Sequence, residues 1–393
     1  MSIVRNEDQK TIGIFNDSFP PIMDGVSLAT KNYAHWLHQK QQPVCVVTPK
    51  SPNYTDNEPY PVYRYTSIPI LGRKPYRFGL PDIDLSFKTE LEQISFGLVH
   101  AHCPFSSGRI ALSIAKKQNI PFVATFHSKY RDDFEHSVHN KFLAKQMTNE
   151  IIRFYEKADE VWISQSSVEE TIREYGFKGK LEIVPFGNDF ITNEPIETLK
   201  SNARNELQIA ENETVFLFVG QHIWEKNIKL IVESLALIND LPFKMIFIGS
   251  GYAKDDLIIL TEKLGISSKV EFIPVIRDRD LLKQYYAAAD LFLFPSKYDT
   301  WGLVVREAAA LCTPSLLVKD STVADIITDN YNGFLTANSV DSFAAKLRDL
   351  VSNPHLIKSV GLNSSKTLTQ SWESVTEEVL DRYQTLMKRT WRK

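Results

Sequence analysis

The sequence has little that could form disulfides, a metal centre or a membrane anchor. Its three cysteines, Cys45, Cys103 and Cys312, are far apart and form neither a CxxC pair nor a metal-ligand spacing. It contains no run of about 18 apolar residues, so no transmembrane helix is expected. The first residues, MSIVRNEDQK, are polar and lack the apolar segment of a signal peptide. We therefore expect a reduced, cytoplasmic protein.

A strong charge of one sign is also missing. The formal net charge of the 393 residues is -3, so nothing indicates a nucleic-acid partner. The hydrophobic fraction of 43% and the charged fraction of 24% are ordinary for a globular protein. At roughly 100–200 residues per domain, the length favours two domains.

Short apolar runs alternate with amphipathic stretches along the chain. This alternation predicts βαβ units, because parallel strands covered on both faces form unbroken apolar runs. The first series of expected strands is TIGIFND, PVCVVTP, GLVHAH, PFVATFH and KLEIVPFGND. The second series is ETVFLFVG, KMIFIGSG, VEFIPVI, LFLFPS and PSLLVKD. We predict an α/β protein with two tandem, doubly wound, Rossmann-like domains.

The pattern restarts between Gly187 and Glu194, where polar residues interrupt it. We place the N-terminal domain at residues 1–188 and the C-terminal domain at residues 189–375. Residues 376–393 are expected to lie in a long amphipathic helix. In open α/β sheets, ligands bind beyond the carboxyl ends of the strands, so a cleft between the two sheets is the expected site.

The stretch YDTWGLVVREAAALCTP, residues 298–314, contains two acids on either side of a helix start. A helix N-terminus presents N–H groups without partners and favours a phosphate. A nearby carboxylate can accept hydrogen bonds from sugar hydroxyls. The spacing of Asp299 and Glu307 therefore suits a ligand with sugar and phosphate parts. On spacing alone, a first-turn acid that stabilises the helix dipole explains Glu307 equally well.

This stretch resembles the signature of the family 4 glycosyltransferases, which are retaining enzymes with the GT-B fold. The matching positions are Pro295, Ser296, Asp299, Gly302, Glu307 and Ala308. The resemblance implies that Glu307 binds the ribose of a nucleotide. It implies that Asp299, with the amides of Gly302 and Leu303, holds the donor sugar and the diphosphate. The family usually has Glu in place of Asp299 and often has Gly in place of Cys312.

Two further loops resemble phosphate-binding segments of the family. NDSFPPIMDGV makes Gly25 the expected diphosphate contact, with a plain turn glycine as the alternative. FVGQHIWEKNI retains the family's lysine as Lys226, and Gln221 replaces its arginine. Lys226 is thus expected to neutralise most of the diphosphate charge, unless it is only a solvated lysine at a helix start. Arg306 or His222 are alternative sources of charge.

The remaining matches concern the sugar and the base. VATFHSKY ends a strand with His127, which the resemblance places beside the donor sugar; a buried structural histidine is the alternative. Ile276, within residues 275–277, is expected to hold the nucleotide base. His100 and His102, in HAHCPFSSG, are interpreted as cleft lining, because a His-x-His pair without a third ligand is weak evidence for a metal.

The resemblance therefore predicts a retaining, metal-independent hexosyltransferase without a cofactor. Its donor would be a UDP- or GDP-sugar and its acceptor a lipid or glycan hydroxyl, with His127, Lys226 and Asp299 in catalytic roles. The GT-B fold implies that helix 376–393 packs back on the first domain. Because of Gln221 and Asp299, an inactive sugar-nucleotide-binding partner is an alternative, as are a sugar-nucleotide epimerase and a phosphorylase of the same fold.

Basic and aromatic segments are candidates for contact with an acceptor or an anionic membrane. PILGRKPYRFGLP, residues 69–81, is similar to segments of family members that glycosylate lipids. The expected helix of residues 139–157 and the terminal KRTWRK could lie on an anionic surface. Solvated charged faces explain both equally well. Peripheral attachment to the inner face of the cell membrane is thus left open.

Overall fold

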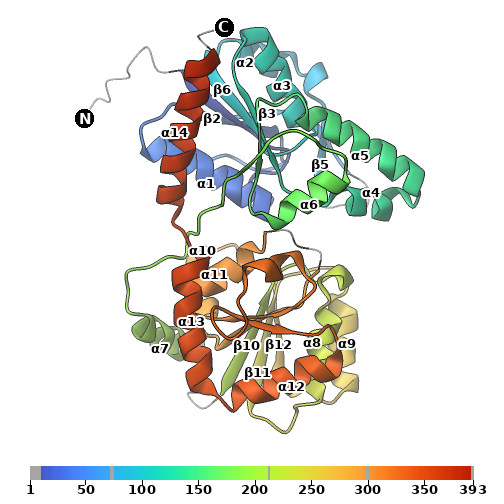
Figure 1. The fold of residues 1–393 in the computed structure, drawn as a ribbon, viewed down its shortest axis with the longest axis vertical. Helices are drawn as coiled ribbons and strands as arrows, with labels where there is room; N and C mark the ends of the chain where they lie inside the picture. The colour runs from blue at the N-terminus through green and yellow to red at the C-terminus, as the bar shows by residue number, and fades with distance from the viewer. Residues whose placement is uncertain (1–9, 71–74, 211–212, 298, 300, 391–393) are drawn as a thin grey trace. The chain divides into compact units, whose positions relative to one another are not determined.

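The computed structural model describes residues 10–70, 75–210, 213–297, 299 and 301–390. The chain divides into two compact units. Unit 1 extends to Gly187 and includes the segment from Trp372 onward, and unit 2 is Asn188–Ser371. Each unit has a parallel sheet with helices against it (Figure 1).

The sheet of unit 1 has seven parallel strands among the described residues, in the order β3-β2-β1-β6-β7-β8-β9. They are β1 (Thr11–Phe15), β2 (Val44–Pro49), β3 (Val62–Tyr65), β6 (Phe96–Ala101), β7 (Phe122–Phe126), β8 (Glu160–Ile163) and β9 (Leu181–Ile183). Every residue of β2, β6 and β7 is buried, as expected for central strands covered on both faces. A separate antiparallel pair joins β4 (Ser67–Pro69) and β5 (Arg77–Gly79).

The helices of unit 1 are α1 (Gly25–Gln39), η1 (Pro81–Ile83), α2 (Leu85–Glu92), α3 (Ser106–Gln118), α4 (Tyr130–Val138), α5 (Lys141–Tyr155), α6 (Ser167–Glu174) and α14 (Trp372–Thr390). The α-helices of unit 1 bury apolar side chains, whereas the short helix η1 buries none. Helix α1 begins where the Asp24 carboxylate accepts a hydrogen bond from the Ser27 amide at 2.7 Å. Helix α14 lies alongside α1 (Figure 1).

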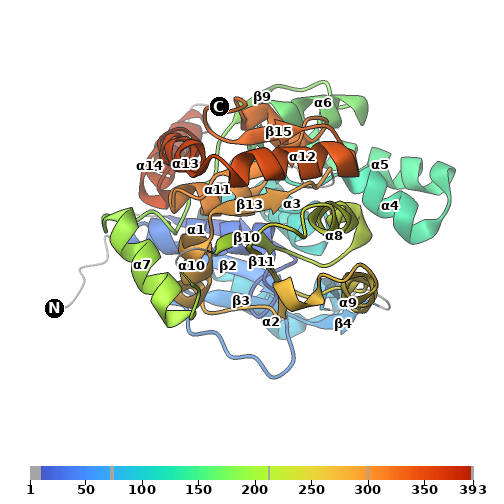
Figure 2. The ribbon, with the colours of Figure 1, turned by 90° about the horizontal axis from the view of Figure 1, so that it is seen from below.

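The sheet of unit 2 has six parallel strands among the described residues, in the order β12-β11-β10-β13-β14-β15. They are β10 (Thr214–Val219), β11 (Phe243–Ile248), β12 (Val270–Ile273), β13 (Leu291–Phe294), β14 (Ser315–Val318) and β15 (Phe334–Thr336). Its α-helices are α7 (Ile196–Glu206), α8 (Ile228–Ala236), α9 (Lys254–Lys263), α10 (Arg279–Ala288), α11 (Leu303–Ala310), α12 (Val340–Val351) and α13 (Pro354–Leu368), and its short 3₁₀ helices are η2 (Trp224–Lys226), η3 (Ser267–Lys269) and η4 (Thr322–Ile326). Figure 2 shows α8 and α9 on one side of these strands and α7 and α10 on the other.

The predicted fold class is confirmed, because two doubly wound parallel sheets follow one another along the chain. The final helix runs from Trp372 to Thr390, so it starts four residues before the predicted position 376. Parts of three predicted segments, residues 1–9, 71–74 and 391–393, lie outside the described residues. Within the described residues, no helix combines the length and hydrophobicity needed to cross a bilayer.

A buried hydrogen bond joins α14 to the sheet of unit 1. The Tyr383 hydroxyl lies 2.6 Å from His100 Nδ1, and His100 Nε2 lies 2.6 Å from the Thr125 hydroxyl. Because all three side chains are buried, losing one partner leaves an unpaired polar atom.

We expect Tyr383→Phe to lower the free energy of unfolding by about 1–3 kcal/mol in urea titrations. Tyr331→Phe, at a half-exposed position, is the control, and equal losses in the two variants would contradict this role.

Candidate active site

Neighbouring strands bring the predicted donor-binding residues of unit 2 to one edge of its sheet. Gln221 follows β10, Ile276 follows β12 and Asp299 follows β13. These strands lie close together in the order β12-β11-β10-β13. Glu307 lies on α11, which starts after the β13 loop. Strand order therefore gathers residues that are far apart in the sequence.

Gly302 is the residue that turns the β13 loop into α11. Its φ angle is +63°, and a Cβ there would lie 2.4 Å from Val323 Cγ1. Glycine alone meets both constraints without strain. The first amides of α11, those of Leu303 and Val304, have no acceptor within the helix. An anion can bind such a helix start.

Lys226 and Asp299 form an ion pair at this edge. Lys226 Nζ lies 2.9 Å from Asp299 Oδ1, and the Ser296 hydroxyl donates to Asp299 Oδ2 at 2.5 Å. The lysine ammonium also lies 5.6 Å from the centre of the Phe294 ring. The side chains of Lys226 and Asp299 are 11% and 24% exposed, so the pair is largely but not completely buried.

Glu307 is the most buried of the predicted acids, with only 2% of its surface exposed. The Arg279 guanidinium donates to its Oε1 at 2.6 Å, and the Tyr286 hydroxyl donates to its Oε2 at 2.9 Å. Each carboxylate oxygen has a second lone pair, so Glu307 can still accept hydrogen bonds from a ligand.

Arg279 is fixed by two further contacts. Its guanidinium donates two hydrogen bonds to Asp189, at 2.7 and 3.0 Å, and lies 4.2 Å from the centre of the Phe190 ring. Burial alone would lower the pKa of Arg279, but the Glu307 and Asp189 carboxylates together raise it. Arg279 therefore carries its charge at every physiological pH.

The other predicted residues of unit 2 contribute less to this network. Gln221 is exposed, and Ile276 is half-buried against the core. Burial, assisted by the Lys254 charge, lowers the pKa of His222 to about 4, so this ring is neutral at pH 7. The Arg306 guanidinium lies 3.6 Å from the centre of the Trp301 ring and donates to the Leu368 carbonyl. His222 is therefore neutral at pH 7, and Arg306 contacts Trp301 and Leu368.

Unit 1 has its own set of predicted residues at the carboxyl ends of its strands. Gly25 is exposed at the start of α1, and a Cβ there would meet no atom within 4 Å. His127 follows β7, and its Nε2 lies 3.0 Å from His102 Nδ1. The His127 ring also stacks on Phe186 at 5.3 Å. Burial lowers the pKa of His127 to about 3, so both His127 and its histidine partner are neutral at pH 7.

The interpretation of His100 as cleft lining is wrong. Its side chain is fully buried. One ring nitrogen is hydrogen-bonded to Thr125 on β7 and the other to Tyr383 on α14. His102 is also buried, but it contacts His127 and so lies directly behind a predicted site residue. Among the described residues, no three His, Cys, Asp or Glu side chains lie close enough to hold a metal ion.

Comparisons with known proteins identify the family of the chain. The family profile described as "Glycosyltransferase Family 4" matches residues 23–190, and that described as "Glycosyl transferases group 1" matches residues 200–367. The chain belongs to the family 4, group 1 glycosyltransferases.

A curated relative from Streptococcus pneumoniae, alpha-monoglucosyldiacylglycerol synthase, is 25% identical over 351 residues, which are 88% of this chain and 79% of the relative. Two solved structures share the fold of this glycosyltransferase. Sucrose-phosphate synthase from Thermosynechococcus elongatus has a TM-score of 0.79 at 19% identity, with 97% of this chain and 100% of that chain covered. Anabaena HepE, solved with UDP and glucose, has a TM-score of 0.74 at 17% identity, with 96% and 100% covered. The predicted GT-B fold is confirmed.

Sequence analysis of this glycosyltransferase missed two polar centres. The first is the pair of Arg279 and Asp189, which are 90 positions apart in the sequence. Arg279 also donates to Glu307 and so joins this pair to the predicted acid. The second is Asp17, whose Oδ1 accepts from the Ser106 and Tyr65 hydroxyls at 2.6 and 2.8 Å. The position of Asp17, the second residue after β1, was the available signal.

We expect Arg279→Met to destabilise unit 2 by roughly 3 kcal/mol, because it leaves the buried Glu307 carboxylate without its cation. Arg277→Met, at an exposed position two residues earlier, is the matched control. The double change Arg279→Met and Glu307→Met should recover part of the loss, since no buried charge is then unpaired. Urea unfolding of the four proteins measures this, and equal stability of Arg279→Met and Arg277→Met would contradict the pairing.

Proposed function

We propose that this glycosyltransferase moves a hexosyl group from a UDP- or GDP-sugar to a hydroxyl group of a lipid or glycan, with retention of configuration and without a metal ion. One observation carries the proposal: at the carboxyl ends of the unit 2 strands, the structure has a buried carboxylate, a partly buried ion pair and a helix start. A sugar nucleotide offers a ribose for the carboxylate, a diphosphate for the helix start and the lysine, and a sugar for the aspartate. The relative named for a glucosylated diacylglycerol and the HepE structure with UDP support the choice of substrates.

Each part of the donor is assigned to particular residues of unit 2. Glu307 accepts hydrogen bonds from the ribose hydroxyls, and Ile276 packs on the base. The amides of Gly302 and Leu303 bind the diphosphate at the start of α11. Lys226 adds the cationic charge, and Gln221 adds a neutral amide donor. Asp299 accepts hydrogen bonds from the sugar.

The reaction requires stabilisation of a departing diphosphate and of an oxocarbenium-like sugar. Lys226 and the helix amides are fixed before the reaction, so they stabilise developing negative charge without reorganisation. The acceptor oxygen attacks the anomeric carbon on the face that the diphosphate leaves, and its proton passes to the departing phosphate oxygen. In unit 1, Gly25 presents its amide to the diphosphate. His127, which is neutral, offers a ring N–H to a sugar hydroxyl without adding charge.

A lipid acceptor would bring the protein to the cytoplasmic face of a membrane as a peripheral protein. Helix α5 is the surface that we assign to this contact. Phe142 and Leu143 are 73% and 47% exposed, and they lie between the exposed Lys141 and Lys145. Apolar side chains flanked by lysines are typical of helices that bind anionic lipid surfaces.

Without a metal in the mechanism, activity depends on protein charge alone. We expect transfer in excess EDTA to equal transfer without EDTA within error, measured as release of UDP or GDP. Added Mg²⁺ or Mn²⁺ should restore nothing, because nothing is lost. A loss of activity in EDTA that a divalent ion reverses would overturn this part of the proposal.

A panel of UDP-, GDP- and ADP-sugars tests the donor site. One donor should bind and undergo slow hydrolysis, and Glu307→Ala should abolish binding.

Lys226→Met should lower kcat/KM by roughly 10²–10³, the usual cost of one lost oxyanion contact. Lys229→Met, which removes an exposed lysine three residues later, is the matched control. Binding without turnover, even with lipid and glycan acceptors present, would instead favour an inactive sugar-nucleotide-binding partner.

A further inference from the structure

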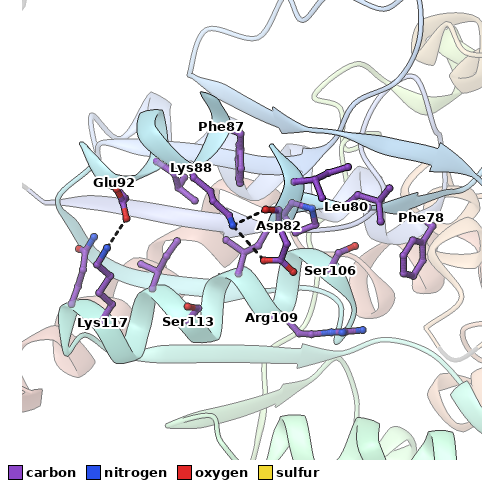
Figure 3. A pocket seen from close by; sticks show the side chains of 17 residues that line it. Phe78, Leu80, Asp82, Phe87, Lys88, Glu92, Ser106, Arg109, Ser113 and Lys117 are labelled. Carbon is purple, nitrogen blue, oxygen red and sulfur yellow. Dashed lines mark hydrogen bonds and ion pairs between the residues drawn. The ribbon is translucent and has the colours of Figure 1, made fainter. Parts of the chain in front are cut away.

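A groove runs between α2 and α3 of unit 1, away from the residues assigned above (Figure 3). Its volume is about 550 Å³. The apolar side chains in its wall include Leu80, Ile83, Phe87, Leu91, Ile110 and Ile114. One of them, Ile83, is 69% exposed, so part of this apolar wall is open to water. Such a surface favours an apolar ligand.

The groove follows one face of α3 along the whole helix. Lining residues occur three and four positions apart, from Ser106 through Arg109, Ile110 and Ser113 to Lys117. At about 1.5 Å per residue, this helix is roughly 20 Å long, which matches an extended chain of about 16 carbons. An open groove of this length, with apolar and polar side chains in its wall, has room for a single hydrocarbon chain.

The two ends of the groove differ in chemistry. Glu92 and Lys117 form an ion pair of 2.6 Å at one end, and Ser106 and Arg109 lie at the other (Figure 3). Arg109 is exposed, and its guanidinium makes no ion pair or hydrogen bond within the part of the chain that the structure describes, so it can donate to ester oxygens. The Glu92 end, by contrast, has its charges already satisfied.

The Ser106 end adjoins the edge of the sheet where the predicted residues of unit 1 lie. The Ser106 hydroxyl donates to Asp17, the second residue after β1. His127 follows β7, and only β6 lies between those two strands. Neighbouring strands are about 4.8 Å apart, so the two loops are separated by roughly 10 Å. That distance is within the reach of a glycerol headgroup.

We propose that this groove holds one acyl chain of a glycerolipid acceptor, with the ester group at Arg109 and the glycerol hydroxyl at the Asp17 edge. The proposal rests on the proposed function and specifies its acceptor as a long-chain glycerolipid. The Lys88–Asp82 ion pair crosses the rim of the groove (Figure 3). Both of its side chains are largely exposed, so the pair is weak and opens readily for the chain.

Photo-crosslinking tests the groove independently of catalysis. The probe is dihexadecanoylglycerol with a diazirine in the middle of one chain, presented in detergent micelles to the full chain. We expect labelled peptides from α2 and α3, and competition by unlabelled dihexadecanoylglycerol. Labelling confined to α5, or labelling that competitor does not reduce, would overturn the proposal. Sugar-nucleotide binding to unit 2 is measured separately, so failure of the donor site is distinguished from failure of the groove.

Two tryptophan variants on α3 test the groove in the reaction. Ser113 is exposed and lines the groove, so Ser113→Trp fills the groove without changing the core. The control is Lys116→Trp, which adds the same ring at an exposed position outside the groove. Ser113→Trp should raise KM for dihexadecanoylglycerol roughly tenfold or more, the loss expected when about two methylenes are excluded. KM for dibutanoylglycerol and donor hydrolysis should not change, and Lys116→Trp should match wild type. Equal effects on long- and short-chain acceptors would overturn the proposal.

Discussion

The buried carboxylate of Glu307 is the group on which the geometry of unit 2 depends. A carboxylate that is 2% exposed is stable only with a cation and hydrogen bonds close to it. Arg279 supplies the cation, and its bidentate contact with Asp189 fixes the guanidinium in turn. These contacts join the first residues of unit 2, the start of α10 and the helix α11. The Glu307 carboxylate is therefore held in one orientation by contacts within unit 2.

The second ion pair at the same edge has a different character. Lys226 and Asp299 are more exposed than Glu307, and the Ser296 hydroxyl gives Asp299 a second partner. Asp299 would therefore keep its hydrogen bond to Ser296 if Lys226 turned away from it. This arrangement also gives a physical reason for an aspartate at position 299, because its short side chain stays within reach of both partners.

Most of the fold could be predicted because buried parallel strands form unbroken apolar runs. The short or peripheral strands were not foreseen: β3, β8 and β15 are only three or four residues long, and β4 and β5 form a separate antiparallel pair. Motif spacing located Asp299 and Gly302 around a helix start, as the structure has them, but α11 begins at Leu303, so Glu307 lies beyond the first turn and is not the predicted first-turn acid. It could not pair Glu307 with Arg279 or Lys226 with Asp299, because strand order rather than sequence spacing sets those contacts.

Helix α3 connects the polar cluster at Asp17 with the groove of unit 1. Its first turn belongs to a polar cluster, in which the Asp17 carboxylate accepts hydrogen bonds from the Ser106 hydroxyl and from the Ser107 amide. Its outer face forms one wall of the apolar groove. A carboxylate at a helix N-terminus is stabilised by the helix dipole, so Asp17 holds the start of α3 against the end of β1. Because the helix is rigid, a chain bound along its outer face would have its polar end fixed relative to the sheet edge and to His127. The same contacts that stabilise the fold thus define where an acceptor hydroxyl could lie.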